Sequence, residues 1–164
     1  MANKAIKYRL YPNAKQKELF AKTFGCCWKV WNLMLSDKID NYKATKSFGK
    51  QTPAMYKTDF PFLKEVDSLA LANVQLNLEQ SFRNCFSSKY KSLKRTRKSY
   101  TTNNQNGTVA VIDNAIKLPK TGKVKAVIHR KPLKTWKIKS VTISQDAVGC
   151  FYASVLFEYD TSVT

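Results

Sequence analysis

Residues 5–13 read Ala-Ile-Lys-Tyr-Arg-Leu-Tyr-Pro-Asn. Apolar and cationic side chains alternate along this stretch, with Ile6, Tyr8 and Leu10 on one side and Lys7 and Arg9 on the other. An alternation with a period of two is typical of a strand that buries one face. Pro12 ends the strand, and Asn13 is a favoured residue for capping a helix. The stretch therefore predicts a strand that leads directly into a helix.

A long helix is predicted after this strand. Apolar residues recur at spacings of three and four from Leu19 to Tyr42, which is typical of a helix with one buried stripe. The predicted stripe consists of Leu19, Phe20, Thr23, Phe24, Cys27, Trp28, Trp31, Met34, Leu35, Ile39 and Tyr42. A polar loop is expected over 42–53 and a short helix over 54–58.

A second long helix is predicted over 68–90, with either Asp67 or Ser68 as its cap. Asn73 and Asn77 lie on its polar side, four residues apart, so they share a helix face. Asparagine can bind an adenine edge in the major groove with two hydrogen bonds. These two residues are therefore candidates for reading DNA bases, and the alternative is an ordinary solvated face.

After Lys98 the sequence changes to short runs rich in β-branched and aromatic residues. The predicted strands are 99–102, 108–112, 115–118, 123–130, 136–144 and 151–159. The tight-turn pair Asn106-Gly107 supports hairpin connections between them. We therefore expect an α+β protein, in which these strands and the N-terminal strand form a small antiparallel β-barrel. The helices would be inserted after its first strand, and small barrels of this kind often bind oligonucleotides.

Positive charge dominates the sequence and is unevenly distributed. Lys and Arg number 29 against 11 Asp and Glu, a formal net charge of +18. Between Gln80 and Gln145 there are 16 Lys and Arg but a single acid, Asp113. A polarised excess of this size indicates a nucleic-acid partner, although a merely soluble basic protein is the alternative.

Two groups of cations are the predicted phosphate contacts. The first is a charge run that we expect to be exposed, consisting of Lys89, Lys91, Lys94, Arg95, Arg97 and Lys98. Its alternative role is a solvated connector. The second group alternates with apolar residues and is therefore predicted to lie on one sheet face. It consists of Lys123, Lys125, Lys137 and Lys139.

The sequence predicts no metal site, no cofactor and no catalytic residues. Its four cysteines have no paired zinc-ligand spacing, so buried free thiols are expected. The lone histidine, His129, is predicted to be a bystander or at most a phosphate contact. The 11 acids are scattered, whereas metal-dependent phosphodiester cleavage needs clustered carboxylates. No signal peptide and no membrane-spanning run are present, so we expect a cytoplasmic, nucleoid-associated protein without a membrane partner.

Six blocks of the sequence carry a resemblance to known proteins. They are Lys4–Pro12, Phe24–Asn32, Leu63–Leu71, Ser99–Gly107, Ile116–Pro119 and Lys137–Ile143. In register along essentially the whole chain, they resemble the TnpB (OrfB) proteins of bacterial insertion sequences. This family consists of RNA-guided DNA endonucleases related to type V CRISPR effectors.

The resemblance implies a wedge-type, oligonucleotide-binding-like barrel that carries a helical recognition domain. Its expected parts are a first strand over 1–12, the helical insertion over 13–98 and the remaining strands over 99–160. The implied partners are a guide RNA and double-stranded target DNA, including the short transposon-adjacent motif. The resemblance places further motif-reading candidates at Tyr56, Lys64, Thr101 and Thr102.

The sequence also departs from the family pattern. We expect the family's nuclease domain, which should follow residue 164, and its zinc ribbon to be missing, and the segment between Tyr90 and Ser99 is shorter than in most relatives. We therefore expect a recognition module without cleavage activity of its own. Two alternatives remain open: a stand-alone repressor that binds duplex DNA without RNA, and an inhibitor of a full-length relative.

Overall fold

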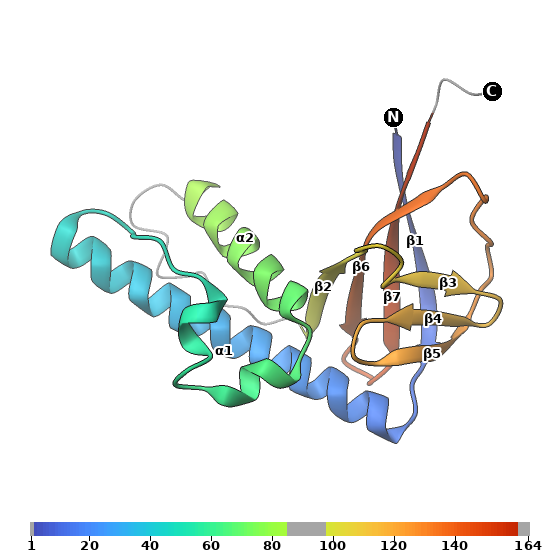
Figure 1. Cartoon of the computed structure of the whole chain (residues 1–164), viewed down its shortest axis with the longest axis horizontal. Coiled ribbons are helices and arrows are strands. Elements are labelled where there is room, and N and C mark those ends of the chain that lie inside the picture. Colours follow the sequence, from blue (N-terminus) through green and yellow to red (C-terminus); the bar gives the residue numbers. More distant parts are fainter. Residues whose placement is uncertain (1, 85–97, 161–164) are drawn as a thin grey trace. The chain divides into compact units, whose positions relative to one another are not determined.

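The computed structural model describes residues 2–84 and 98–160 (Figure 1). The chain divides into two compact units. Unit 1 comprises Met1–Ala21 and Lys98–Thr164, and unit 2 comprises Lys22–Arg97. Unit 1 contains all the strands, whereas unit 2 contains most of the helical residues.

Unit 1 is built on one antiparallel sheet of seven strands. The strands are β1 (Ala2–Tyr11), β2 (Ser99–Asn103), β3 (Ala110–Ile112), β4 (Ala115–Leu118), β5 (Gly122–Val127), β6 (Lys137–Gln145) and β7 (Phe151–Tyr159). Their order is β2-β6-β7-β1-β5-β4-β3, so the N-terminal strand lies at the centre of the sheet. The predicted α+β class is confirmed, and so are the N-terminal strand and its antiparallel partners.

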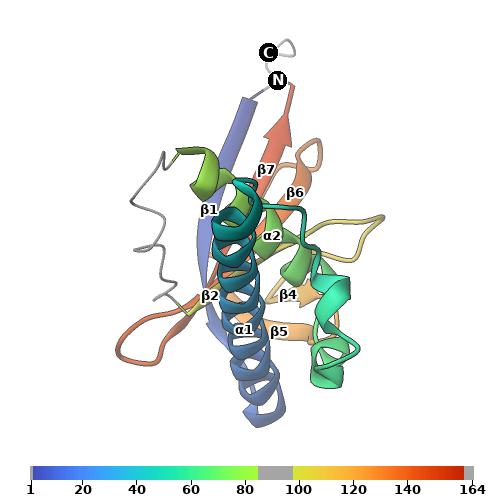
Figure 2. The ribbon, with the colours of Figure 1, turned by 90° about the vertical axis from the view of Figure 1, so that its left-hand side faces the viewer.

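The predicted antiparallel β-barrel is only partly formed by the residues that the structure describes. The strand order ends at β2 on one side and β3 on the other, and these two edges do not pair. Strands β3 to β5 run across the direction of β1 and β7, so the sheet curls into a half-barrel (Figures 1 and 2). Closure requires a ladder between the edge strands, and β3 has only three residues, all paired with β4.

The inner face of the sheet holds the core of unit 1. Ile6, Tyr8 and Leu10 point inward from β1 and pair with inward residues of β7, as their alternation predicts. The inward positions of the other strands contribute Ile116, Val124, Val141, Ile143, Val155 and Phe157, all fully buried. We call the opposite side, which carries Lys7 and Arg9, the outer face.

The long helix α1 (Ala14–Thr45) confirms the predicted helix, but its buried stripe is shifted to include Cys26 and Val30, which the predicted stripe lacked. Phe20, Cys27 and Met34 are fully buried at spacings of seven. Trp28, which was predicted to belong to the stripe, is 54% exposed. The reason is geometric. Cys27 lies near the middle of the buried stripe, and Trp28 is turned about 100° away from it around the helix.

Unit 2 adds two short 3-10 helices and one further α-helix. The 3-10 helices are η1 (Pro53–Tyr56) and η2 (Pro61–Glu65), the first within a residue or two of the predicted short helix. The α-helix α2 (Ser68–Asn84) occupies the predicted second helical segment, and the remainder of that prediction falls in 85–97, outside the described residues. No described helix has the length and apolar character needed to cross a bilayer.

Side-chain caps fix the starts of both long helices. The amide of Gln16 donates to Asn13 Oδ1 at 2.9 Å, and the amide of Asn13 donates to Gln16 Oε1 at 2.9 Å. This reciprocal pair is a capping box. At α2 the amide of Leu69 donates to Asp67 Oδ1 at 3.0 Å, so Asp67 is the cap. The choice between Asp67 and Ser68 is thereby settled.

We expect Asp67→Ala to lower the free energy of unfolding by about 1 kcal/mol, because an amide of the first turn loses its acceptor. Ser68→Ala is the neighbouring control and should change stability by less than about 0.5 kcal/mol. Urea denaturation of the full chain measures both. A larger loss from Ser68→Ala than from Asp67→Ala would contradict the assignment of the cap.

Candidate nucleic-acid interface

The most concentrated cation group in unit 1 lies on the β4–β5 hairpin. Lys117 on β4 is directly opposite Lys123 on β5, and Lys125 follows two residues later. All three side chains are exposed, while Ile116, Leu118 and Val124 between them point into the core. We call these three residues the β4–β5 lysine patch. The sequence prediction included Lys123 and Lys125 but missed Lys117, although the buried alternation of β4 would have identified it.

Facing lysines repel one another, so this arrangement costs stability unless an anion neutralises it. In the part of the chain that the structure describes, no ion pair engages Lys117, Lys123 or Lys125. The backbone beneath them is nevertheless fixed, because Gln16 Nε2 donates to the Lys123 carbonyl at 2.8 Å. The patch therefore presents three cations on a rigid hairpin, which suits a phosphate backbone.

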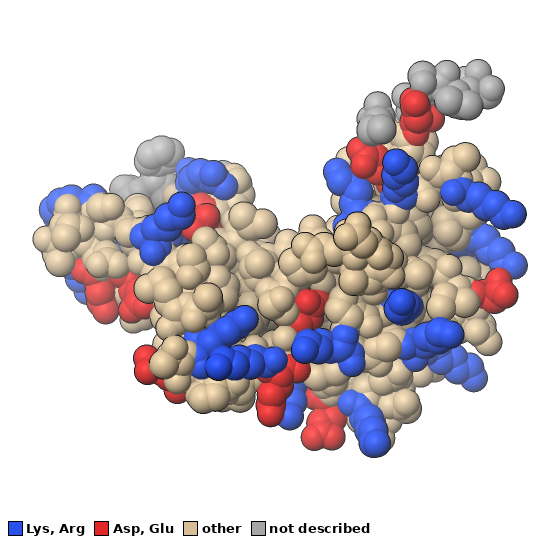
Figure 3. Space-filling view, in the orientation of Figure 1, with Lys and Arg blue, Asp and Glu red and all other residues tan. Residues whose placement is uncertain are grey.

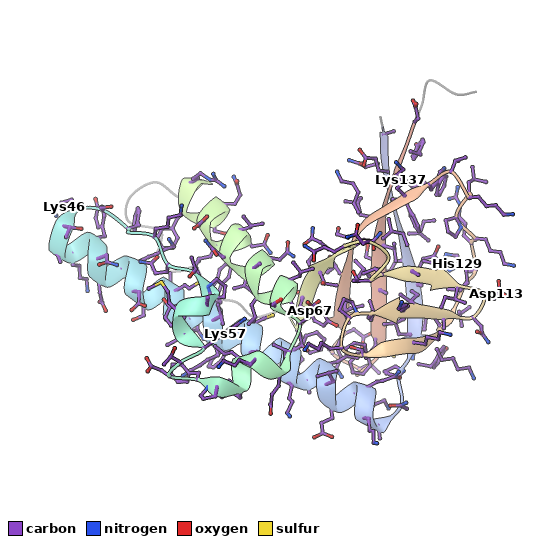
Figure 4. The ribbon with its side chains drawn as sticks, viewed as in Figure 1. Lys46, Lys57, Asp67, Asp113, His129 and Lys137 are labelled. Carbon is purple, nitrogen blue, oxygen red and sulfur yellow. The ribbon has the colours of Figure 1, made fainter. Side chains whose placement is uncertain are left out.

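The two other predicted sheet lysines lie on β6: Lys137 and Lys139. They are exposed, as predicted, but they are distant from the β4–β5 lysine patch. Lys125 on β5 pairs with Tyr11 at one end of β1. Lys137 on β6 pairs with Glu158 on β7, and Glu158 in turn pairs with Asn3 at the other end of β1. Eight residues of strand span roughly 26 Å. Figure 4 shows Lys137 at the start of β6, and the four lysines thus form two separate pairs.

The predicted charge run lies almost entirely outside the described residues. This applies to Lys89, Lys91, Lys94, Arg95 and Arg97. Lys98 is described and exposed, and its carbonyl accepts a hydrogen bond from the Gln145 amide at 3.0 Å. Figure 3 shows further Lys and Arg side chains scattered over the visible surface of the strand-containing part.

Thr101 and Thr102 lie next to each other on β2 and therefore point to opposite faces. Thr101 is half-buried on the outer face, where its hydroxyl lies 2.8 Å from that of Thr142. Thr102 is fully buried on the inner face. A ligand on the outer face can reach Thr101, whereas Thr102 is not accessible to DNA in this conformation.

Tyr56, the motif-reading candidate on η1, is buried and already hydrogen-bonded. Its hydroxyl donates to Asp37 Oδ2 at 2.6 Å and so ties η1 to α1. Burial raises the pKa of Tyr56, and the hydrogen bond and charge of Asp37 raise it further. The geometry thus gives this side chain a structural role.

We expect Tyr56→Phe to lower the free energy of unfolding by about 1–3 kcal/mol, because the half-buried Asp37 carboxylate loses its donor. The raised pKa of Tyr56 means that this stabilisation is complete below pH 10 and decreases as the pH rises above that value. Denaturant melts of both proteins between neutral and strongly alkaline pH measure the effect. Equal stability at neutral pH would contradict the structural role.

The remaining motif-reading candidates of unit 2 differ in how accessible their side chains are to a ligand. Asn73 is half-buried, and its Nδ2 donates to the Leu69 carbonyl one turn earlier at 2.9 Å. Asn77 is exposed, and within the described residues its amide side chain makes no hydrogen bond. Lys64 on η2 is exposed as well. Asn77 and Lys64 are therefore the more accessible of the predicted motif-reading side chains.

The cysteines that the structure describes behave as ordinary thiols. Cys26 and Cys27 are buried, and burial raises the pKa of Cys26. Cys85 lies outside the described residues. Within 2–84 and 98–160, no three His, Cys, Asp or Glu side chains lie close enough together to hold a metal ion. His129 is exposed in the loop after β5, with its ring 5.4 Å from that of Tyr8 (Figure 4).

Comparison with known proteins gives two matches. Residues 1–47 match a family model described as a helix-turn-helix domain, whose name refers to the OrfB proteins. A protein of Streptomyces pristinaespiralis named "Putative RNA-guided DNA endonuclease" is 29% identical over 171 residues, covering 94% of this chain. The chain is thus similar to the OrfB family model over its first 47 residues and to this protein along most of its own length. It spans 41% of the length of that relative.

The structure gives the matched OrfB segment a different geometry from its description. A helix-turn-helix unit places two helices around a short turn. Within 2–47, the described residues form a strand, β1, and a single helix, α1. The described residues of this segment therefore form no recognition helix presented by a turn.

Proposed function

We propose that this chain is the nucleic-acid-binding recognition module of a TnpB-like RNA-guided DNA endonuclease. It binds the guide RNA and reads the short DNA motif beside the target. The β4–β5 lysine patch carries the proposal, because three exposed cations lie together on one hairpin there without a described acidic partner. The similarity to an RNA-guided endonuclease along 94% of the chain supports the same conclusion.

Both units carry an excess of positive charge that favours RNA and DNA backbones as ligands. Unit 1 contains 15 Lys and Arg against five Asp and Glu, and unit 2 contains 14 against six. In such a system the guide RNA selects the target by base pairing, while the protein recognises phosphates, shape and a short motif. We propose that the residues of this chain bind nucleic acid and do not cleave it. A wedge-type role for the curled sheet belongs to the same proposal.

Binding assays test this function most simply with the full chain. We expect fluorescence anisotropy to show binding to structured RNA and to duplex DNA, with affinity falling as salt concentration rises. We also expect no cleavage of a matched plasmid in magnesium. Failure to bind both ligands at low salt would contradict the proposal, and so would cleavage that persists through further purification.

Asn77 provides the sharpest test of motif reading. We expect Asn77→Ala to reduce discrimination between a preferred and a scrambled motif by about 1–3 kcal/mol, since a two-bond base contact is lost. Asn73→Ala is the matched comparison and should have a smaller effect on discrimination, because its amide already donates to Leu69. Preferred motifs are first selected from a randomised DNA library. Equal weakening of both DNAs by Asn77→Ala would show that Asn77 reads no base.

A further inference from the structure

The centre of the outer face carries a second group of cations, which are held by aromatic rings. Lys7, Arg9 and Tyr11 point outward from β1, and Tyr152 points outward from the neighbouring strand β7. Arg9 and Tyr152 are directly opposite each other in the sheet. We call these four residues the β1–β7 platform. It belongs entirely to unit 1 and adjoins the β4–β5 lysine patch, because Tyr11 is directly opposite Lys125 in the sheet.

Contacts within the platform hold the cations in place. Lys7 Nζ lies 4.5 Å from the centre of the Tyr152 ring. Arg9 Cζ lies 5.6 Å from the same ring and 5.0 Å from the Tyr11 ring. Contacts of this kind favour a cation over an aromatic face. In the described part of the chain, the Arg9 guanidinium makes no hydrogen bond and no ion pair. Its Nε is buried without a hydrogen-bond partner, so the described contacts that hold this half-buried guanidinium are those with the two rings.

An acid that contacts the platform, Asp146, uses its carboxylate for hydrogen bonds within the turn between β6 and β7. Asp146 Oδ1 accepts hydrogen bonds from the amides of Val148, Gly149 and Cys150 at 2.8–3.1 Å, which lowers the pKa of Asp146. Its other oxygen, Oδ2, accepts a hydrogen bond from the Tyr152 hydroxyl at 3.3 Å. Asp146 thus orients the Tyr152 ring, and among the described residues no carboxylate forms an ion pair with Lys7 or Arg9.

A row of hydroxyl groups crosses the outer face beside the platform. Register places Thr101, Thr142 and Ser154 on β2, β6 and β7, and Ser154 lies opposite Lys7 on β1. The Thr101 and Thr142 hydroxyls are 2.8 Å apart. Hydroxyls can bind phosphate oxygens and the ribose 2′-hydroxyl group.

We propose that the β1–β7 platform binds single-stranded RNA. The Tyr11 and Tyr152 rings stack on unpaired bases, while Lys7 and Arg9 contact phosphates. Aromatic rings interleaved with cations suit single strands, because the bases of a duplex are stacked inside it and cannot reach a sheet face. The hydroxyl row favours RNA over DNA. This inference rests on the proposed function and assigns one ligand class to a named surface.

The test uses the full chain and labelled oligouridine of about 12 nucleotides, compared with oligothymidine and a duplex of similar length. Tyr152→Leu keeps the apolar bulk and removes the ring. We expect it to weaken oligouridine binding roughly 5- to 150-fold, the equivalent of one lost base–aromatic stack. Its salt dependence should not change, because no charge is lost.

A charge variant and its matched control complete the test. Lys7→Gln with Arg9→Gln should flatten the dependence of log affinity on log salt by about 1.4. The control is Lys131→Gln with Lys134→Gln, which removes the same charge from two exposed residues of the β5–β6 loop. That loop lies on the inner side, where the Tyr8 hydroxyl donates to the Arg130 carbonyl. The control should leave the slope nearly unchanged.

Crosslinking of the wild-type chain to oligouridine that contains 4-thiouridine gives a readout that does not depend on variant folding. The platform predicts crosslinked peptides that include Tyr11 or Tyr152. The platform is overturned if crosslinks fall elsewhere, if Tyr152→Leu binds oligouridine like the wild type, or if the two charge pairs behave alike. Any of these results alongside tight binding of structured RNA would leave the proposed function intact. Absence of all RNA and DNA binding would overturn both.

Discussion

Replacing Lys117, Lys123 and Lys125 together by glutamine is expected to weaken the binding of single-stranded RNA about 100-fold at 0.1 M salt. Each neutralised phosphate contributes about −0.7 to the slope of log affinity against log salt. Three lost contacts therefore flatten the slope by about 2 units. If the salt lines meet near 1 M, this corresponds to a loss of about two orders of magnitude at 0.1 M.

The triple variant should bind RNA more weakly, but its folded state should be as stable as that of the wild type or more stable. Lys117 and Lys123 face each other on the hairpin, so their neutralisation removes a repulsion. We expect the melting temperature of the triple variant to equal or exceed that of the wild type. The control replaces three exposed lysines from other elements, Lys43, Lys50 and Lys134. Equal slopes for the two triple variants would show that total charge, and not the β4–β5 lysine patch, governs binding.

Replacing Phe20 by alanine is expected to lower the free energy of unfolding by about 3–5 kcal/mol, as for other buried phenylalanines. Phe20 is fully buried, and its ring centre lies 5.4 Å from that of Phe151 and 6.3 Å from that of Tyr100. It therefore fixes the first turns of α1 to the inner face of the sheet. A cavity left there cannot be filled by its strand neighbours, because their backbones are held in ladders.

Trp28→Ala on the same helix is the matched control. Although tryptophan is larger, Trp28 is 54% exposed, and its loss should cost less than about 1 kcal/mol. Denaturant unfolding of both variants measures the difference, and Phe20→Leu should recover much of the loss. If Trp28→Ala were as destabilising as Phe20→Ala, the apolar stripe of α1 would be the broad one that the sequence pattern predicts.

Local signals in the sequence identified the elements of this fold well. The alternation of Ile6, Tyr8 and Leu10 predicts the buried face of β1, and Asn13 marks the start of α1. These features depend on neighbouring residues only. Trp28 was wrongly predicted to be buried. Spacings of three and four are compatible with an apolar stripe that extends to either side of Cys27, and tertiary packing decides which side is buried.

Features that depend on strand order were harder to predict. The distance between Lys125 and Lys137 follows from the placement of β1 and β7 between β5 and β6, which no local pattern reveals. The unpaired edges of the sheet, at β2 and β3, also follow from the strand order. By contrast, the opposite orientations of Thr101 and Thr102 follow from strand alternation alone, so the inward position of Thr102 was predictable. The hydrogen bond between Tyr56 and Asp37 joins distant residues and has no sequence signature.

The central claim, that this chain is an RNA-binding module of a TnpB-like system, is tested most directly by the nucleic acid that copurifies with it. The full chain is expressed in a bacterium together with the DNA that surrounds its gene, purified without nuclease, and washed at moderate salt. We predict bound material that ribonuclease destroys, that deoxyribonuclease leaves intact, and that sequencing shows to be enriched in transcripts of that locus. Bound duplex DNA without RNA would instead indicate a stand-alone repressor, and a protein free of nucleic acid that also binds none when RNA is added would contradict the claim.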